Sequence, residues 1–396
     1  MDEKKYTLRY GTEKDYEDIL DFGNYVFHTD FRFLPKLYVG NPARAGEHVL
    51  VTEPRENGER IRAMVGSFKI PMSVAGQKLL IRGIGTVSVH PYDRGKGYMK
   101  LAMHKAIEDA KAEGTDFMIL SGRKQRYQHY GFDQCAAFYN FELTPSVFEQ
   151  LTRFGVEGIT APVSLDGYRL LSEEESAAYE ADCRALFESQ PVYGIRKNFT
   201  ETAKSWRSEL RVLLKDGAFA GYTAAGNPYG VMTAGELLLN KNAETIPALL
   251  AVYQGLTGGK QQLAVNVQPF QTDLIHALGL IAEHGKLETG HGIHVLNYAR
   301  VAQAYLQVKA SYEPLMDGSY VFRVPGTASV RLSVESGKVH AENVSEDVPA
   351  DITLTHLRMM NFLFEPFGHA GIHGAQPELE KNWFPIPVCF SQQDNV

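Results

Sequence analysis

The stretch from Lys78 to Glu113 constrains the fold of this chain more than any other part of its sequence. Residues 78–90 are rich in β-branched and alternating apolar residues, as in a buried strand, and Pro91 follows them. Apolar residues at helical spacing then run over 97–113, where Gly114 ends the pattern. A strand that passes through a short glycine-containing turn into a long helix predicts a mixed α/β domain.

The turn between this strand and this helix has the composition of a phosphate site. Its sequence is His90-Pro91-Tyr92-Asp93-Arg94-Gly95-Lys96-Gly97-Tyr98. Unpaired N–H groups and the dipole at a helix N-terminus attract anions, and glycine lets a pyrophosphate approach the backbone closely. The same residues also suit an ordinary turn with a basic rim. The preceding strand and the long helix favour the anion site, and the Walker pattern Gly-x-x-x-x-Gly-Lys-Ser/Thr is absent.

The length of the chain requires more than one domain. It has 396 residues, whereas single hydrophobic cores stop growing near roughly 250–300 residues. The order of elements divides it into residues 1–150, which carry the glycine loop, 151–290, which repeat a similar order without that loop, and 291–396, which form a small α+β unit. Residues 155–162 are predicted to be a linker.

The predicted elements of the first unit are a helix over 13–27, strands over 48–53, 61–70 and 78–90, a helix over 97–113 and a strand over 117–120. Those of the second are helices over 173–188, 200–207 and 245–254 and strands over 209–214, 218–225, 232–239 and 262–267. Those of the third are helices over 301–306 and 356–363 and strands over 320–324, 330–334 and 351–354.

Composition argues against several classes of function. The net charge of -7 does not suit a nucleic-acid partner, which needs clustered Lys and Arg, and weakly favours cationic small molecules. No apolar run reaches the ~20 residues of a membrane span, and Met1–Tyr6 has no apolar signal sequence. We therefore expect a cytoplasmic protein without membrane contact, in which the scattered Cys135, Cys183 and Cys389 are reduced.

Two other kinds of site are considered and set aside. The histidine pairs His291–His294 and His369–His373 suggest zinc, but no cysteine lies near them and the second pair is interrupted by glycine, so we expect no metal. A serine hydrolase is not expected either, because Ser121 lacks the Gly-x-Ser-x-Gly elbow.

The segment from Val87 to Met99 resembles the acyl-CoA pyrophosphate loop of the GNAT superfamily, whose pattern is Arg/Gln-x-x-Gly-x-Gly/Ala. Arg94 and Gly97 match this pattern, and Met99 departs from it as in the Eis-type (enhanced intracellular survival) branch. The segment Tyr-x-x-Tyr-Gly-Phe at residues 127–132 is also similar to that branch. The resemblance implies an α/β fold (α+β, with mixed sheets), in which two fused GNAT-type domains precede a sterol carrier protein-like domain. It further implies a hexamer that transfers acetyl from acetyl-CoA to amines of aminoglycosides and sometimes to protein lysines.

The resemblance also assigns roles to individual residues. The residues that would contact acetyl-CoA are Val87 and Val89, through backbone groups to the pantetheine arm, and Arg94, Gly95, Lys96, Gly97 and Tyr98, around the pyrophosphate. Tyr127 would be the general acid that protonates the departing thiolate. The alternative for Tyr127 is packing under Phe132.

Two further sites would serve the amine. His28 and Asp30 lie in a segment that resembles the family's substrate rim, where a carboxylate faces the amine; an Asp after a helix is also a common turn residue. The family uses the terminal α-carboxylate as general base, which here belongs to Val396 in place of the usual Phe. A frayed, solvated terminus is the alternative.

Three functions compete with acetylation of a small cationic amine. One is acetylation of protein lysine. Another is a lipid or sterol carrier, to which the apolar residues of 356–364 would contribute, although a carrier needs no pyrophosphate loop. The last is a CoA-binding sensor without catalysis.

Overall fold

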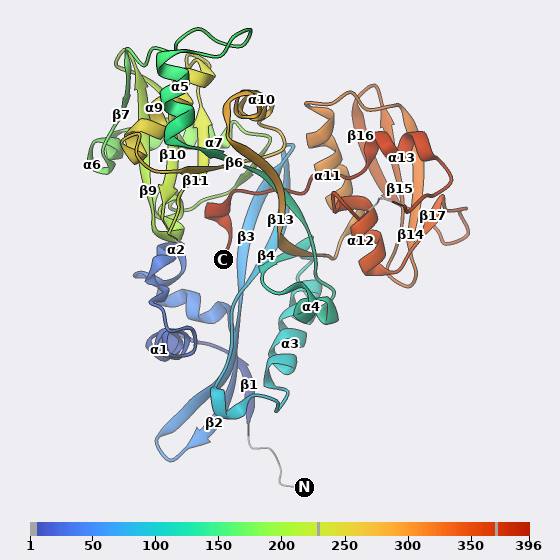
Figure 1. Ribbon diagram of the computed structural model, residues 1–396. Helices are drawn as coiled ribbons and strands as arrows, with labels where there is room; N and C mark the ends of the chain where they lie inside the picture. The colour runs from blue at the N-terminus through green and yellow to red at the C-terminus, as the bar shows by residue number, and fades with distance from the viewer. Residues whose placement is uncertain (1–5, 228–229, 369–370) are drawn as a thin grey trace.

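The computed structural model describes residues 6–227, 230–368 and 371–396. Over these residues the strands form a large sheet of 13 strands and a separate sheet of four. Helices pack on the faces of both sheets, and the C-terminus returns to the middle of the molecule (Figure 1). The mixed α/β class with mixed sheets, predicted from the sequence, is confirmed.

The N-terminal part supplies one half of the large sheet. Its elements are β1 (Thr7–Tyr10), α1 (Tyr16–Phe27), α2 (Pro35–Tyr38), β2 (His48–Arg55), β3 (Gly58–Val74), β4 (Gln77–Val89), α3 (Tyr98–Ala112), β5 (Phe117–Ser121), α4 (Lys124–Tyr127) and β6 (Asp133–Leu143). Strands β1 to β4 are antiparallel neighbours, and α3 crosses over to β5, which is parallel to β4.

Alternation of side chains along β2 and β3 assigns a helical layer to each face of this half. Val49 and Val51 pack with α3 on one face, whereas Leu50 packs with α1 and α2 on the other. Figure 1 shows α1 and α3 on opposite sides of the strands. Val396, the last residue of the chain, packs in the core under α1 and α2.

The central part extends the same sheet. Its elements are α5 (Pro145–Arg153), β7 (Tyr168–Leu170), α6 (Glu173–Ser176), α7 (Glu180–Glu188), β8 (Val192–Gly194), α8 (Phe199–Ala203), β9 (Ser208–Lys215), β10 (Ala218–Gly226), β11 (Met232–Leu239), α9 (Thr245–Thr257), β12 (Leu263–Val267), α10 (Thr272–Ile281) and β13 (His284–Val295). Strand β11 is parallel to β12 and α9 connects them, as α3 connects β4 to β5.

Strands β6 and β13 join the two halves into one sheet. β6 pairs with β12 of the central part, and β13 lies between β5 and β6. The domain boundary expected between residues 290 and 291 therefore falls inside β13, which is hydrogen-bonded to strands of the N-terminal part. The sequence did not indicate this strand, because its three glycines and three histidines give it no strand periodicity.

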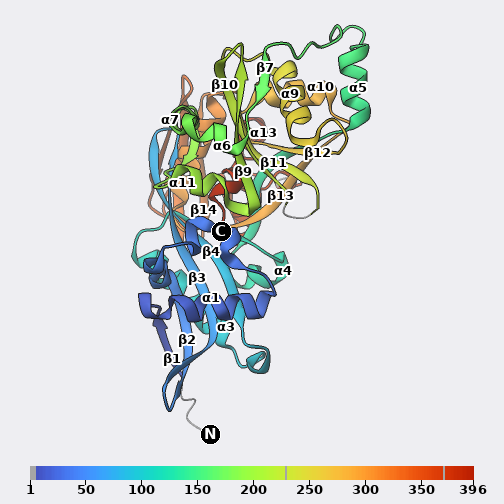
Figure 2. The ribbon, with the colours of Figure 1, turned by 90° about the vertical axis from the view of Figure 1, so that its left-hand side faces the viewer.

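The C-terminal part forms the four-stranded sheet. Its elements are α11 (Tyr298–Ala310), β14 (Gly318–Val324), β15 (Ala328–Glu335), β16 (Lys338–Asn343), β17 (Ile352–Thr353), α12 (His356–Phe364) and α13 (Pro377–Trp383). The chain then leaves this unit and runs to Val396 beside the N-terminal half. Figure 2, turned by 90°, again shows the C-terminus between the N-terminal half and the central part.

The long predicted elements agree with the structure, and the irregular ones differ. The helix predicted over 97–113 is α3, and the strand over 78–90 is β4. The single helix predicted over 173–188 is wrong: a 3-10 turn at Ala177–Tyr179 separates α6 from α7. The helix predicted over 200–207 ends at Ala203, and the 3-10 turn Ser205–Arg207 that follows has a left-handed backbone at Trp206, with φ 62°.

Candidate active site

An opening between β4 and β5 is the first feature of the site. The two strands pair in parallel only over Ile81–Ile84 and Phe117–Leu120. Beyond Ile84 the register of β4 with β3 shifts, and Thr86 takes a left-handed conformation with φ 50°. A bulge of this kind bends the strand. Over residues 85–89, which include Val87 and Val89, the edge of β4 on the side of β5 therefore has no partner strand among the described residues.

The glycine loop follows directly at the end of β4. The 3-10 turn Pro91–Asp93 leads into Gly95 and Gly97, which have φ values of 83° and 82°. A Cβ at either glycine would have no described heavy atom within 4 Å, so the space in front of the loop is open. Gly97 is the N-cap of α3, whose first amides point out of the helix without intrahelical acceptors. These residues fit a bound pyrophosphate.

Asp93 holds this loop in place, and the sequence did not identify its role. Its carboxylate is buried, accepts a hydrogen bond from Lys96 Nζ at 2.6 Å and lies 3.1 Å from Arg62 Nη1. Burial alone would raise the pKa of Asp93, but Lys96 and Arg62 lower it below its usual value. Lys96 therefore supports the loop as well as adding charge, whereas Arg94 is exposed at its tip. Tyr98 packs against Tyr6, with ring centroids 5.5 Å apart.

Tyr127 lies beside Gly122, the residue that follows β5. It ends α4, and its side chain is buried in the core that includes Phe132. Its ring lies so close to Gly122 that a Cβ there would overlap it. Burial raises the pKa of the Tyr127 hydroxyl, so that it carries its proton at neutral pH. A protonated hydroxyl in this position suits a general acid.

The last residue of the chain packs onto β4 at the opening. Val396 is 8% exposed, and a Cβ at Gly83 would overlap its Cγ2 atom. A Cβ at Gly85 would lie 3.5 Å from the carboxyl carbon of Val396. Gly85 is the residue at which β4 and β5 diverge. The terminus is therefore inserted into the N-terminal half, and the solvated, frayed end that was the alternative does not describe it.

The neighbouring residue ties the terminus to β5. The Asn395 side-chain nitrogen donates a hydrogen bond to Ser121 Oγ at 2.8 Å, and this oxygen lies 3.0 Å from His291 Nδ1. Burial lowers the pKa of His291 to about 4, so the ring is neutral at pH 7 and its nitrogen can accept the Ser121 hydroxyl proton. His291 thus stabilises the terminus, a role that no local sequence signal predicts.

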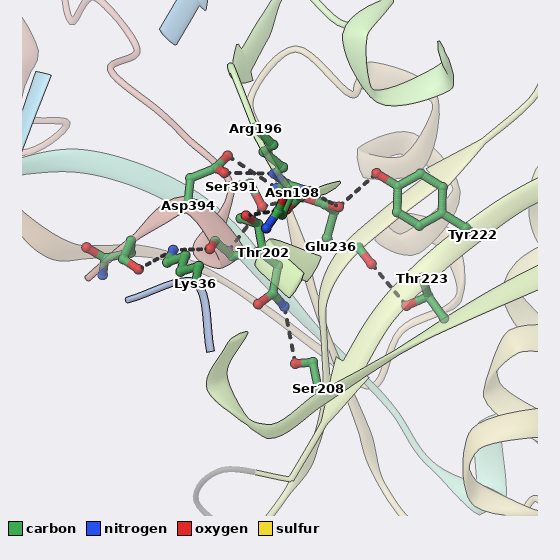
Figure 3. A network of polar contacts seen from close by, with 12 residues as sticks. Lys36, Arg196, Asn198, Thr202, Ser208, Tyr222, Thr223, Glu236, Ser391 and Asp394 are labelled. Atoms are coloured by element: carbon green, nitrogen blue, oxygen red, sulfur yellow. Dashed lines mark hydrogen bonds and ion pairs between the residues drawn. The ribbon is translucent and has the colours of Figure 1, made fainter. Parts of the chain in front are cut away.

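A buried ionic network anchors the tail to the central part (Figure 3). Arg196 Nε lies 2.8 Å from Asp394 Oδ1, and its Nη2 lies 2.6 Å from Glu236 Oε2. The Tyr222 hydroxyl donates to Glu236 Oε1 at 2.7 Å. Burial opposes the charge of Arg196, but Asp394 and Glu236 keep its pKa above the usual value. Removing one partner of such a buried pair costs about 3–5 kcal/mol.

A cavity of about 180 Å³ opens beside the terminus. It lies between the N-terminal and central parts, and Lys36, Phe68, Ile70, Arg196, Asp394 and Val396 contribute to its lining. It reaches the terminal residue from the side of α2 and α8.

The two residues expected at the substrate rim lie apart from this lining. His28 is exposed and ends α1 with a left-handed backbone at φ 53°. The Asp30 carboxylate caps the 3-10 turn Phe31–Phe33 and pairs with Arg32 at 2.7 Å. Arg32 holds the pKa of Asp30 below its usual range. Neither residue lines the cavity next to Val396.

The described residues contain no group of three or more His, Cys, Asp or Glu that could hold a metal ion. His291 and His294 have other neighbours, and His369, a residue of the other pair considered for zinc, lies outside the described residues. Among the helices that the structure describes, none is long and apolar enough to cross a membrane.

Comparison with known proteins finds a family similar to the N-terminal part. The sequence profile of the acetyltransferase (GNAT) domain family matches residues 7–135, a range that includes the opening, the glycine loop and Tyr127. A search of curated protein sequences found no match.

Solved structures share the fold over the whole chain. A GCN5-related N-acetyltransferase from Kribbella flavida is 16% identical with a TM-score of 0.66, and the alignment covers 99% of this chain and 98% of that one. One from Anabaena variabilis is 11% identical with a TM-score of 0.66 and coverages of 97% and 99%. Eis1 from Mycobacterium abscessus is 12% identical with a TM-score of 0.62 and coverages of 99% and 100%.

Proposed function

We propose that this chain is an N-acetyltransferase that moves the acetyl group of acetyl-CoA to a primary amine of a cationic small molecule, such as an aminoglycoside. The observation that carries the proposal is the position of Val396 on Gly83 and Gly85, where β4 turns away from β5. Its α-carboxylate is the general base in this proposal, and Tyr127 is the general acid.

Each residue of the site has a defined task in this reaction. The loop from Arg94 to Tyr98 binds the pyrophosphate, and the free edge of β4 at Val87 and Val89 offers backbone groups to the pantetheine arm. The thioester then lies between β4 and β5, beside Val396 and Tyr127.

Proton transfer follows from the same geometry. An ammonium substrate must lose a proton before its nitrogen can attack, and a carboxylate with a reference pKa of about 3.5 is ionised at pH 7 and accepts it. The nitrogen forms the amide bond as the carbon–sulfur bond breaks. As the amide forms, the nitrogen loses its second proton to water. The departing thiolate takes the Tyr127 hydroxyl proton, water returns a proton to the tyrosinate, and the carboxyl group releases its proton to solvent.

The domain arrangement proposed from the sequence is two GNAT-type units followed by a sterol carrier protein-like unit. The parallel pair β11 and β12, connected by α9, supports the second unit. The connection before α9 contains no glycine and places Glu244 at the N-cap, where a carboxylate would repel a phosphate. One cofactor site per chain is therefore proposed, in a cytoplasmic hexamer.

A carrier function has less support. The apolar side chains of α12 that were considered for a lipid tunnel, Met359, Met360, Phe362, Leu363 and Phe364, are at most 1% exposed and belong to the core. Acetylation of protein lysine remains the alternative within enzymes, and a CoA-binding sensor is the alternative without catalysis.

Thiol release from acetyl-CoA separates these functions. The assay is run with aminoglycosides, polyamines and a lysine-containing peptide as acceptors, and with no acceptor. Amine-dependent thiol release with small cations supports the proposal, and a preference for the peptide supports the alternative. Binding of acetyl-CoA without release by any acceptor would contradict both and indicate a sensor.

A further inference from the structure

Lys36 connects the helical layer of the N-terminal half to the end of the chain. It lies in α2, and its Nζ atom donates hydrogen bonds to the main-chain oxygens of Gln393 and Asn395, the latter at 2.7 Å (Figure 3). The Asn395 oxygen belongs to the peptide group whose nitrogen is that of Val396. One side chain thus holds both carbonyl groups that flank Asp394.

The environment of Lys36 differs from that of an ordinary surface lysine. The Lys36 side chain is half-buried, and among the described residues no carboxylate lies within ion-pair distance of its amine. Burial lowers its pKa to about 7, with smaller contributions from Asp394, Arg196, Arg44 and Glu236. Burying an amine without an ionic partner is costly, and a methionine of similar length would fill the same space without that cost. A methionine could not donate hydrogen bonds to the two carbonyl oxygens, so these bonds are what a lysine adds to packing at this position.

Two other anchors of the tail bind its side chains. Arg196 binds Asp394 through its side chain, and Ser121 binds Asn395 through its side chain. Lys36 is the residue that binds the main chain next to Val396 from the layer of α1 and α2. Rotation about the Asn395 backbone changes the direction of the Val396 carboxylate, and a hydrogen bond to the Asn395 carbonyl oxygen opposes that rotation.

We propose that Lys36 is a positioning residue, which holds the end of the chain so that the Val396 carboxylate faces the opening between β4 and β5. The inference rests on the proposed function, because it assigns Lys36 to the placement of the general base. Lys36 acts through the tail and takes no proton from the substrate.

The test compares Lys36→Met with the full-length chain by two independent measurements. The first is release of Val396 by a carboxypeptidase, followed by mass spectrometry, which reports whether the terminus is held. We expect release at least tenfold faster in Lys36→Met, because local opening exposes the terminal peptide. The second is steady-state kinetics, in which kcat should fall about 10- to 100-fold while KM for acetyl-CoA stays within threefold.

Matched variants separate positioning from a general loss of structure. Lys36→Gln keeps an amide donor and should recover part of kcat, and Lys14→Met, at an exposed lysine of the same half, should match the wild type in both measurements. In a chain that lacks Asn395 and Val396, Lys36→Met should lower kcat no further, because the group that it positions is absent.

Each outcome decides a different question. Val396 that stays protected in Lys36→Met overturns the inference while leaving the proposed function intact. An equal loss of kcat in the truncated chain also overturns it, since Lys36 would then act on the fold. If the wild type shows no amine-dependent turnover, the proposed function fails and the catalytic part of the inference fails with it, and carboxypeptidase release still shows whether Lys36 holds the chain end.

Discussion

Asn395 donates a hydrogen bond to Ser121 across 274 residues of chain, at a distance of 2.8 Å. This contact places the penultimate residue at the end of β5, while Val396 lies on Gly83 and Gly85 of β4. The last two residues therefore bridge the two strands at the point where they separate. The terminus therefore lies on β4, the strand that leads into the glycine loop.

The glycine loop should determine the affinity for acetyl-CoA. Arg94→Ala removes an exposed charge, and Gly97→Val places a side chain at φ 82°, where the backbone must approach the pyrophosphate. Loss of a hydrogen bond to a charged group costs about 1.5–3 kcal/mol, so Kd should rise roughly 10- to 100-fold. Isothermal titration with acetyl-CoA measures this change.

Two variants control for effects outside the loop. Gly114→Val introduces a comparable strain at the other end of α3, where the glycine has φ 75° and open space around it. Arg153→Ala removes an exposed arginine that is distant in sequence and paired with Glu149. Both should keep the wild-type affinity. Unchanged affinity in Arg94→Ala and Gly97→Val would mean that the pyrophosphate binds elsewhere.

Tyr127→Phe should separate catalysis from binding. The substitution removes only the hydroxyl that we propose protonates the thiolate, so kcat should fall by roughly 10²- to 10⁴-fold with little change in acetyl-CoA affinity. Tyr130→Phe, three residues later in the same segment, is the matched control and should keep most activity. Wild-type turnover by Tyr127→Phe would leave the residue with a packing role only.

The lowered pKa of Lys36 should make stability depend on pH in a predictable direction. Its pKa is about 7 in the folded protein against an ordinary value of 10.5, so between these values the unfolded chain binds one more proton. Folded stability therefore rises with pH across this window by about 1.4 kcal/mol per pH unit, and the contribution is constant below pH 7.

Urea unfolding of the wild type and Lys36→Met at several pH values isolates this effect, because all other groups titrate in both proteins. The wild type should gain stability relative to the variant from pH 7.5 to pH 9.5, and the difference should be constant below pH 6.5. A difference that is the same at every pH would show that Lys36 keeps its charge in the folded protein.

Local patterns in the sequence predicted the elements that carry the glycine loop. β4 and α3 have strong periodicity and clear boundaries at Pro91 and Gly114, so their bounds were predicted within about one or two residues. β1, β6 and β13 were missed, because their pairing partners, and in β13 three glycines, outweigh local preference.

The contacts that complete the site could not be read from the sequence. Lys36 lies 359 residues from Asn395, and Arg196 lies 198 residues from Asp394. No spacing rule relates such pairs, since only the return of the chain from the C-terminal unit brings them together. The resemblance indicated the terminal carboxylate at Val396, and nothing indicated its anchors. The Asp30–Arg32 pair also depends on turn geometry that the sequence did not specify.

The role of the terminal carboxylate can be tested by changing that group alone. Cys389 is a natural junction for native chemical ligation, so residues 389–396 can be added as a synthetic peptide that ends in either the Val396 carboxylate or the Val396 carboxamide. The two chains differ by one charge and have the same shape. We expect the carboxamide chain to lose roughly 10²- to 10⁴-fold in kcat toward amine acceptors, with the KM for acetyl-CoA unchanged. Equal kcat values for the two chains would contradict the assignment of the C-terminus as the general base.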